Sequence, residues 1–416
     1  MNQSATGEGS PTVLLLGTLD TKGEEFEFLR DRLQLAGVEA LLADVGTLEP
    51  PRGRPDITRE AVGAETGVDV AALGAAGDRG AAVAAMAGAA AALARRLYDE
   101  GRIHGVLSAG GSGNTAIATT AMQALPVGVP KLMVSTMAAG DTSDYVGGVD
   151  VMMMASVTDV AGVNSISSRI LANAAAAMAG MVRAPAPELE GGRPLVAATM
   201  FGVTTPCVTR AREALEERGY EVLVFHATGT GGKAMEALVE GGLLTGVLDV
   251  TTTELCDDLV GGVLSAGPAR LEAAGRAGVP QVVSLGALDM VNFGARDTVP
   301  PKFERRNLYV HNPSITLMRT TPEECAELGR RIAAKLARAT GPVSLFVPLG
   351  GVSMIDAEGQ PFHDPDADAA LFDALREGLS GSEVELIELE HNINDEEFAT
   401  AMVDKLDEYL RGRRDR

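Results

Sequence analysis

The sequence is poor in aromatic residues and cysteine, and it has no tryptophan. Only 4% of its 416 residues are aromatic, so Ala, Val, Leu and Met must build the core. Its three cysteines, Cys207, Cys256 and Cys325, stand far apart without a CxxC pair. This pattern argues against a disulfide framework and a structural zinc site. No HxH or HExxH spacing occurs either, so we assign no metal-ligating residues from these motifs.

Positive charge is also scarce. There are 35 Lys and Arg residues against 57 Asp and Glu, which gives a formal net charge of −22. Such a surface repels nucleic acids and anionic membranes, so we expect neither as a partner. Residues 1–11 lack the pattern of a signal peptide, and the apolar stretch Ala81–Ala94 is short and alanine-rich, which predicts a packed helix. A cytoplasmic location is the default expectation.

Apolar runs followed by glycine-rich loops are what the sequence has in abundance. Val13–Leu16 predicts a strand buried on both faces, Gly17–Gly23 a loop, Glu24–Ala36 a helix and Ala40–Val45 the next strand. This β-loop-α-β order begins a parallel sheet. Further strands are predicted at 105–108, 131–135, 195–199, 221–225 and 246–250, and helices at 78–98, 116–124, 160–181, 206–218 and 233–240.

The chain is too long for one ordinary domain, and its two halves look alike. The segment Val13–Asp44 is echoed by Leu195–His226, and Gly105–Leu107 by Gly246–Leu248, so duplication is the simplest account. We predict an α/β fold of two Rossmann-like, doubly wound subdomains with mainly parallel sheets. The predicted bounds are 1–183 for the N-terminal subdomain, 184–194 for a Pro- and Gly-rich linker and 195–416 for the C-terminal subdomain.

The strongest candidate binding element is Gly110–Gly113, which lies directly between a strand and a helix. In doubly wound sheets, ligands bind at the carboxyl ends of strands. Glycines let the backbone approach a ligand, and free N–H groups at a helix N-terminus favour an anion. Ser112 and Thr115 add hydroxyl donors. The alternative is a tight turn that needs glycine only for packing.

Two other segments carry charge suited to a phosphate. In Thr18–Lys22, Lys22 can neutralise phosphate and Asp20 can hold Mg²⁺ or a ribose hydroxyl, although a capped helix start with a solvated lysine explains the same residues. Arg79 opens a helix and can fork onto phosphate. Neither GxxxxGK[ST] nor GxGxxG occurs, which argues against a Walker A loop and a dinucleotide-dependent oxidoreductase.

The C-terminal half places histidines and acids near strand ends. His226, Glu254, Asp289 and His311 are the candidate catalytic residues, because they could converge as an acid–base or metal site. The alternative is that each is a hydrogen-bonded loop residue. Cys256 beside Glu254 is either a nucleophile or a buried, inert thiol.

A resemblance to a known family covers nearly the whole chain. In the first half it is carried by five motifs in order, GTLDTKGEE, DRGAAVAAM, GVLSAGGSGNTAIAT, GVPKLMVSTMAAGDT and DVAGVNSISSRILANAAAAMAGMV, and in the second half by HNPSITLMRTT and LGGVSMIDAEGQPFHDP. The chain resembles the Tm-1-like ATP-binding family, formerly an uncharacterised family. The resemblance implies a homodimer with ATP and Mg²⁺ on the first subdomain. The implied ATP contacts are Thr18, Leu19, Asp20, Thr21, Lys22, Arg79, Gly110, Gly111, Ser112 and Gly113.

Two departures from the family pattern matter. Asn114 stands where the family usually has glycine, and Ala139 stands where it usually has serine, which weakens a phosphate role for the loop after Ser135. Relatives often occur with, or fused to, a TIM-barrel protein that resembles phosphoenolpyruvate hydrolases. This implies a metabolic enzyme or enzyme subunit that uses Mg-ATP with a small organic acid near the second glycine-rich loop, 226–232. A non-catalytic, nucleotide-responsive regulatory protein that acts through a partner is the alternative.

Overall fold

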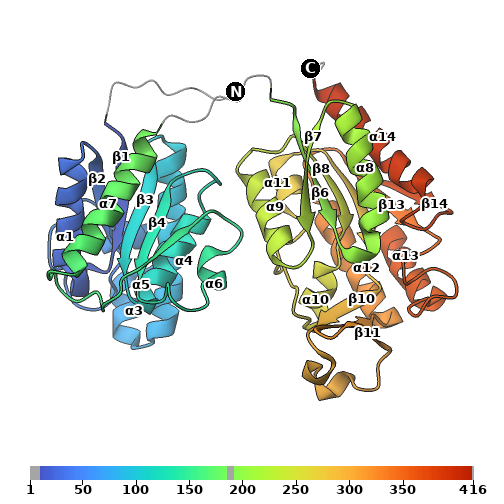
Figure 1. Ribbon diagram of the computed structural model, residues 1–416, viewed down its shortest axis with the longest axis horizontal. Helices are drawn as coiled ribbons and strands as arrows, with labels where there is room; N and C mark the ends of the chain where they lie inside the picture. Colours follow the sequence, from blue (N-terminus) through green and yellow to red (C-terminus); the bar gives the residue numbers. More distant parts are fainter. Residues whose placement is uncertain (1–9, 185–191, 415–416) are drawn as a thin grey trace. The chain divides into compact units, whose positions relative to one another are not determined.

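The computed structural model describes residues 10–184 and 192–414, and its chain divides into two compact units (Figure 1). Unit 1 is Met1–Glu188 and unit 2 is Leu189–Arg416. Most of the linker predicted at 184–194 lies outside the described residues. Each unit has its own parallel sheet with helices on both faces, which confirms the predicted fold class.

Unit 1 is built on a five-stranded parallel sheet with the order β2-β1-β3-β4-β5. The strands are β1 (Thr12–Gly17), β2 (Glu39–Asp44), β3 (Gly105–Gly110), β4 (Lys131–Ser135) and β5 (Met152–Ala155). The apolar run Val13–Leu16 is fully buried in β1, as expected for a strand covered on both faces. Leu14 pairs with Leu41 on β2 and Val106 on β3.

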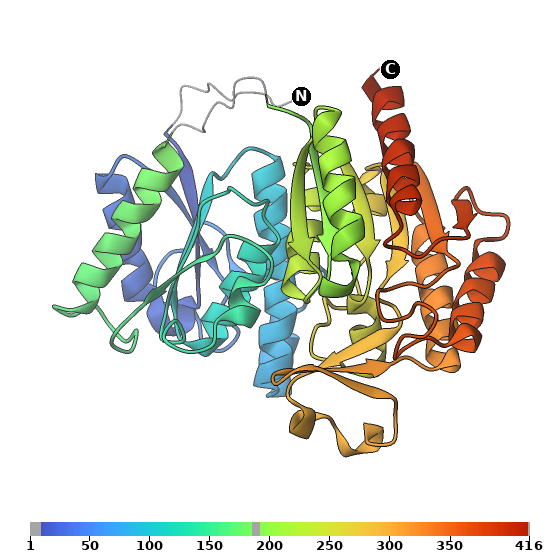
Figure 2. The same ribbon diagram turned by 45° about the vertical axis from the view of Figure 1, so that its right-hand side comes forward.

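The helices of unit 1 are α1 (Leu19–Leu35), α2 (Arg59–Ala64), α3 (Val70–Ala76), α4 (Arg79–Asp99), α5 (Ser112–Gln123), α6 (Ser143–Val146) and α7 (Ser167–Arg183). Helices α1 and α7 cover one face of the sheet, and α4 and α5 cover the other (Figures 1 and 2). Phe26 and Leu29 of α1 and Met178 of α7 pack on Leu15 and Leu107 of the central strands.

Helix α4 agrees with the helix predicted at 78–98 to within one residue at each end. It has 21 residues and is the one helix in the described part of the chain that is long and apolar enough to cross a membrane. Its buried residues, among them Met86, Leu93 and Leu97, alternate with exposed ones, and the helix packs against α5, α2 and α3. We therefore interpret α4 as a packing helix of the α/β unit.

Unit 2 contains a six-stranded parallel sheet with the order β14-β13-β9-β8-β6-β7. Its strands are β6 (Leu195–Met200), β7 (Glu221–His226), β8 (Gly246–Thr251), β9 (Gln281–Gly286), β13 (Val343–Pro348) and β14 (Glu385–Leu389). Its helices are α8 (Thr205–Glu217), α9 (Thr230–Glu240), α10 (Glu254–Val260), α11 (Ala273–Ala277), α12 (Pro322–Leu336), α13 (Pro365–Leu379) and α14 (Glu396–Arg414). Helices α8 and α14 pack on one face, and α9 to α13 on the other.

A small antiparallel sheet, which sequence analysis did not predict, extends unit 2 (Figure 2). It has the order β10-β12-β11, with β10 (Met290–Phe293), β12 (Ile315–Arg319) and β11 (Leu308–Asn312). Short 3-10 turns lie at Gly202–Thr204, Arg296–Thr298 and Pro301–Phe303.

The two parallel sheets share the same order for their first five strands: second, first, third, fourth, fifth. The repeated segments noted in the sequence fall at equivalent strands, because Gly105 begins β3 and Gly246 begins β8, each beside the first strand of its sheet. The matching topology supports the duplication hypothesis.

Candidate functional site

A cavity of about 290 Å³ opens in unit 1 at the carboxyl ends of β1 and β3. These neighbouring strands lead to helices on opposite faces of the sheet, α1 and α5, so the cavity lies at a topological switch point. Its lining residues are Thr18, Asp20, Thr21, Lys22, Val45, Thr47, Leu48, Arg79, Val83, Gly111, Ser112, Gly113, Asn114 and Ile117. Eight of the ten residues predicted to contact ATP are among them.

The glycines of the β3–α5 turn differ in what the protein's own packing requires. A side chain at Gly110 would lie 2.8 Å from Cβ of Asn114, so this glycine is needed for packing. At Gly111 the nearest atom would be 3.8 Å away, and at Gly113 it would be 3.7 Å away. Neither has a positive φ. Packing therefore explains why residue 110 is a glycine. Neither packing nor backbone geometry explains the glycines at 111 and 113, and both of these residues line the cavity.

Helix α5 begins at this turn with its first amides free. Gly111 is the N-cap and offers no side-chain cap. The main-chain N–H groups of Ser112, Gly113 and Asn114 have no hydrogen-bond acceptor among the described residues. Together with the helix dipole, such amides attract a negative group.

Arg79 supplies the positive charge. A side chain at Gly113 would meet Nη2 of Arg79 at 3.7 Å, which places the guanidinium beside the α5 turn. Arg79 is exposed, and within the described parts of the chain it has no hydrogen bond or ion pair. An unpaired guanidinium on a chain of net charge −22 is available to an anionic ligand.

The Thr18–Lys22 segment is less free than sequence analysis suggested. Helix α1 starts at Leu19 and not at Glu24, because the Thr18 carbonyl accepts from the N–H groups of Thr21 and Lys22. The Lys22 ammonium donates to the carbonyl of Val160. Its charge lines the cavity while the side chain also anchors the segment before α7.

Two predicted contact residues do not line the cavity. Leu19 is fully buried in the core between α1 and the sheet, and its N–H donates to Asp44 at 3.1 Å. Gly110 ends β3, where its carbonyl accepts from Thr136. The Thr115 hydroxyl, which we expected to contact the ligand, is instead hydrogen-bonded to the Gly111 carbonyl and to the Ser135 hydroxyl.

Sequence analysis missed several lining residues. Thr47 and Leu48 come from the loop after β2, which carries no motif, and the Leu48 N–H donates to the Asp20 carboxylate at 3.1 Å. Asn114 was noted only as a departure from the family. Its amide nitrogen donates to Ser108 and Ala109, whereas its oxygen is buried without a donor. That unpartnered oxygen was not foreseeable without the fold.

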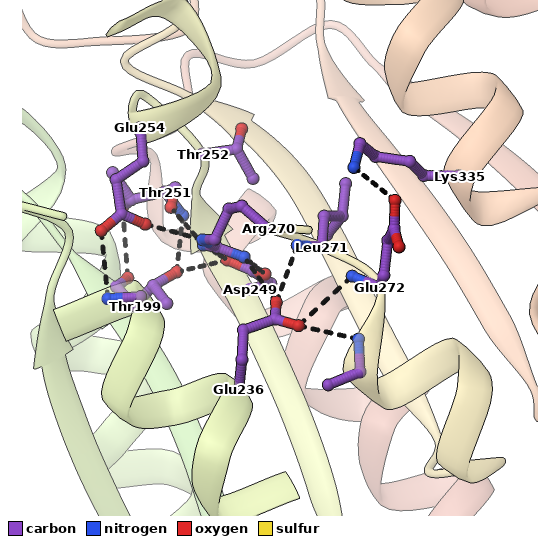
Figure 3. Close-up of polar contacts among 12 residues, drawn as sticks. Thr199, Glu236, Asp249, Thr251, Thr252, Glu254, Arg270, Leu271, Glu272 and Lys335 are labelled. Atoms are coloured by element: carbon purple, nitrogen blue, oxygen red, sulfur yellow. Dashed lines mark hydrogen bonds and ion pairs between the residues drawn. The ribbon is translucent and has the colours of Figure 1, made fainter. Parts of the chain in front are cut away.

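In unit 2 the second glycine-rich loop already holds an anion of the protein itself (Figure 3). The Glu254 carboxylate accepts from the N–H groups of Gly229 and Gly232 at 2.7 and 3.0 Å, at the start of α9. Its other oxygen accepts from Arg270 at 2.6 Å, and Arg270 also forks onto Asp249. We therefore place no organic acid at this loop.

The four catalytic candidates do not share a hydrogen-bonded cluster in the described chain. Glu254 belongs to the Arg270 network, while Asp289 accepts from Ser353 at 2.8 Å on another part of unit 2. His226 at the end of β7 and His311 on β11 are exposed, near Phe201 and Tyr309 respectively.

Asp289 belongs to a buried acidic group around Arg319. Arg319 donates to Asp356 at 3.1 Å and Asp368 at 2.7 Å. Burial raises the pKa of Asp289 to about 6, and burial together with the charges of Asp289 and Asp368 raises the pKa of Asp356 to about 9. One Asp289 oxygen is buried without a donor.

Cys256 is an unsuitable nucleophile. Its thiol is fully buried and donates to the Leu288 carbonyl at 3.4 Å, and burial raises its pKa well above the usual value. A thiol that resists ionisation reacts slowly. The structure therefore supports the interpretation of an inert core thiol.

The fold and the cavity define a two-unit, doubly wound α/β protein with a candidate anion site at the switch point of its first sheet. The chain belongs to the uncharacterised protein family UPF0261: residues 11–187 match the family's N-terminal domain and residues 193–410 its C-terminal domain.

Relatives match across nearly the whole chain. A UPF0261 protein of Clostridium tetani is 54% identical over 95% of this chain and 98% of its own length. One of Rhizobium meliloti is 50% identical over 94% of this chain and 97% of its own. The ToMV resistance protein Tm-1 of Solanum lycopersicum is 40% identical over 95% of this chain, which spans 55% of the tomato protein.

Proposed function

We propose that this protein binds ATP, as its Mg²⁺ complex, in the switch-point cavity of unit 1. The observation that carries the proposal is that Gly111 and Gly113 are needed neither for packing nor for backbone geometry. Glycine is an acceptable N-cap, which accounts for Gly111 in part, but Gly113 lies inside the first turn of α5, where alanine is the better helix former. If a phosphate group binds the first amides of α5 opposite Arg79, side chains at positions 111 and 113 would block its approach. This explains why both residues are glycine.

The oxygen groups in the cavity fit the magnesium ion of such a complex. Mg²⁺ prefers oxygen ligands and is usually held by one or two protein groups together with substrate phosphates. Asp20 and Asn114 both line the cavity, and the Asn114 amide oxygen is buried without a donor. These two residues would hold the ion, which would neutralise phosphate charge.

The use of ATP belongs to the same proposal. From the family resemblance we also propose that the protein is a cytoplasmic, homodimeric metabolic enzyme. It would use Mg-ATP with a small organic acid, alone or together with a TIM-barrel partner. The non-catalytic regulatory protein stays the alternative. ATP turnover measured with candidate acids and the partner barrel separates the two, because sustained binding without turnover would favour the regulator.

Isothermal titration calorimetry on Gly113→Val tests the binding site. An added Cβ has room in the folded protein, 3.7 Å from its nearest neighbour, and the valine side chain would occupy space near the α5 amides. We expect Mg-ATP binding to be lost while the thermal melting curve is kept. Gly88→Val is the matched control, because Gly88 is an exposed helical glycine with no atom within 4 Å of an added Cβ. Unchanged ATP affinity in Gly113→Val would refute the site.

A further inference from the structure

A second cavity, of about 530 Å³, adjoins the switch-point cavity in unit 1. We propose that it is the base subsite of the nucleotide, with Arg59 as a residue that contacts the base. The inference rests on the proposed function and adds where the heterocycle lies and what recognises it.

The two cavities border the same loop. Thr47 and Leu48, which follow β2, line both. A ligand with its phosphates at the α5 amides that extends past these two residues would enter the second cavity. The second cavity then receives the end of the ligand farthest from the phosphates.

The walls of the second cavity suit a flat, largely apolar ring. Leu48 is 63% exposed, which is unusual for a large apolar side chain, and Pro50, Pro51 and Val70 lie around the same cavity. Ligand pockets typically combine such apolar walls with a few polar groups that fix orientation. Stacking a base against Leu48 and the prolines would remove this apolar surface from water.

Arg59 is the polar group with unused donors. Its Nε donates to Asp44 at 2.7 Å, and the side chain is only 8% exposed. Neither terminal nitrogen has an acceptor in the described chain, and Nη2 is buried. A buried donor without an acceptor costs about 1–3 kcal/mol. A ring nitrogen or carbonyl of a base supplies an acceptor at this wall.

The charge around Arg59 argues against a second anionic group. Asp44 already neutralises the guanidinium, and the other charged lining residues, Glu49 and Glu60, are acidic. A phosphate or carboxylate would face net negative charge, whereas a neutral heterocycle would not. An exocyclic amine on the base can also donate to these carboxylates.

Comparing Mg-ATP with inorganic tripolyphosphate separates base contacts from phosphate contacts. Ala71 is exposed on α3 and lines the second cavity, so Ala71→Phe places a bulky side chain there while Arg59 itself is kept. We expect ATP affinity to fall at least about tenfold, with tripolyphosphate affinity unchanged within about twofold. Ala72→Phe, on the same helix but outside the cavity lining, is the matched control and should change neither affinity.

Arg59→Lys tests the guanidinium itself, because the lysine ammonium keeps the charge opposite Asp44 but the two Nη groups, which have no acceptor in the part of the chain that the structure describes, are lost. It should weaken ATP and spare tripolyphosphate. Equal effects on both ligands, or none on ATP in either variant, would overturn the base subsite while leaving the phosphate site standing. If the unmodified protein binds neither ligand, the proposed function fails and the base subsite fails with it.

Discussion

At the scale of single residues, the cavity is defined by groups that lack partners. Arg79 has no anion, the α5 amides have no acceptor and the Asn114 oxygen has no donor within the described chain. Buried polar groups in folded proteins are nearly always satisfied, so the Asn114 oxygen is the exception among these groups, and the proposed nucleotide would supply partners for all three. Lys22 differs, because its ammonium already has the Val160 carbonyl.

This difference leads to an unequal expectation for the two cations. Arg79→Ala should weaken ATP binding about 10- to 100-fold, and AMP binding less, because an unpaired guanidinium is free to contact distal phosphates. Lys22→Ala should have a smaller effect on ATP and should lower thermal stability through the lost anchor to Val160. Calorimetric titration of both nucleotides checks this, and equal losses for ATP and AMP in Arg79→Ala would move the guanidinium away from the distal phosphates.

Asp257 predicts a pH dependence of stability. It accepts from the N–H and the amide of Asn292 at 2.8 and 2.6 Å, and burial raises its pKa from 3.8 to about 7. The folded state thus holds a proton that the unfolded chain releases. The contribution of Asp257 to stability is fully present below about pH 4 and is lost as the pH rises through about 7.

Asp257→Asn mimics the protonated form and should flatten this dependence. Between pH 5 and pH 8 the free energy of unfolding of unit 2 should fall by about 1–3 kcal/mol more in the unmodified protein than in the variant. Thermal melts of both proteins at several pH values give the comparison, in which titration of other groups cancels. Parallel pH profiles would contradict the assignment.

At the scale of elements, α5 and α9 begin in the same way but differ in what binds their first amides. Both helices begin at a glycine-rich turn after a parallel strand. At the start of α9 the Glu254 carboxylate, paired with Arg270, accepts from the free amides, whereas the start of α5 has no carboxylate bound to its amides within residues 10–184 and 192–414. Glu254 does for α9 what we propose a phosphate does for α5, so the binding function is expected in unit 1 only.

Removing this internal anion should be costly for stability. Glu254→Ala leaves the α9 amides open and one side of the fully buried Arg270 unpaired, so we expect unit 2 to lose about 3–5 kcal/mol. Chemical denaturation monitored by circular dichroism measures the loss. Glu216→Ala, which breaks the exposed Arg212–Glu216 pair at 3.8 Å, should cost less than about 0.5 kcal/mol. Similar losses in both variants would contradict this account of Glu254.

At the scale of the whole molecule, two units with separate cores predict a ligand effect confined to one of them. Mg-ATP at about 100 times its dissociation constant should stabilise unit 1 by about 2.7 kcal/mol. Hydrogen exchange should show slower exchange at the start of α5 and in the 45–51 loop, with unit 2 unchanged. Protection spread evenly over both units would contradict a site built from unit 1 alone.

Much of this protein follows from the sequence alone. Short apolar runs such as Val13–Leu16, followed by glycine-rich loops, are typical of strands covered on both faces, and their alternation with helices predicts parallel sheets. The glycine-rich turn after β3 and the position of Arg79 are local features as well. These are short-range patterns, so they predicted the fold class and most of the residues that line the cavity.

Only the tertiary structure decided which of these residues are free to act. Lys22 and Leu19 are two of five consecutive residues predicted to bind, yet one reaches the Val160 carbonyl and the other enters the core. Glu254 and Asp289 likewise went to separate buried networks. Partners far apart in the sequence determine whether a charge or an amide is already satisfied, and a sequence pattern carries no record of that pairing.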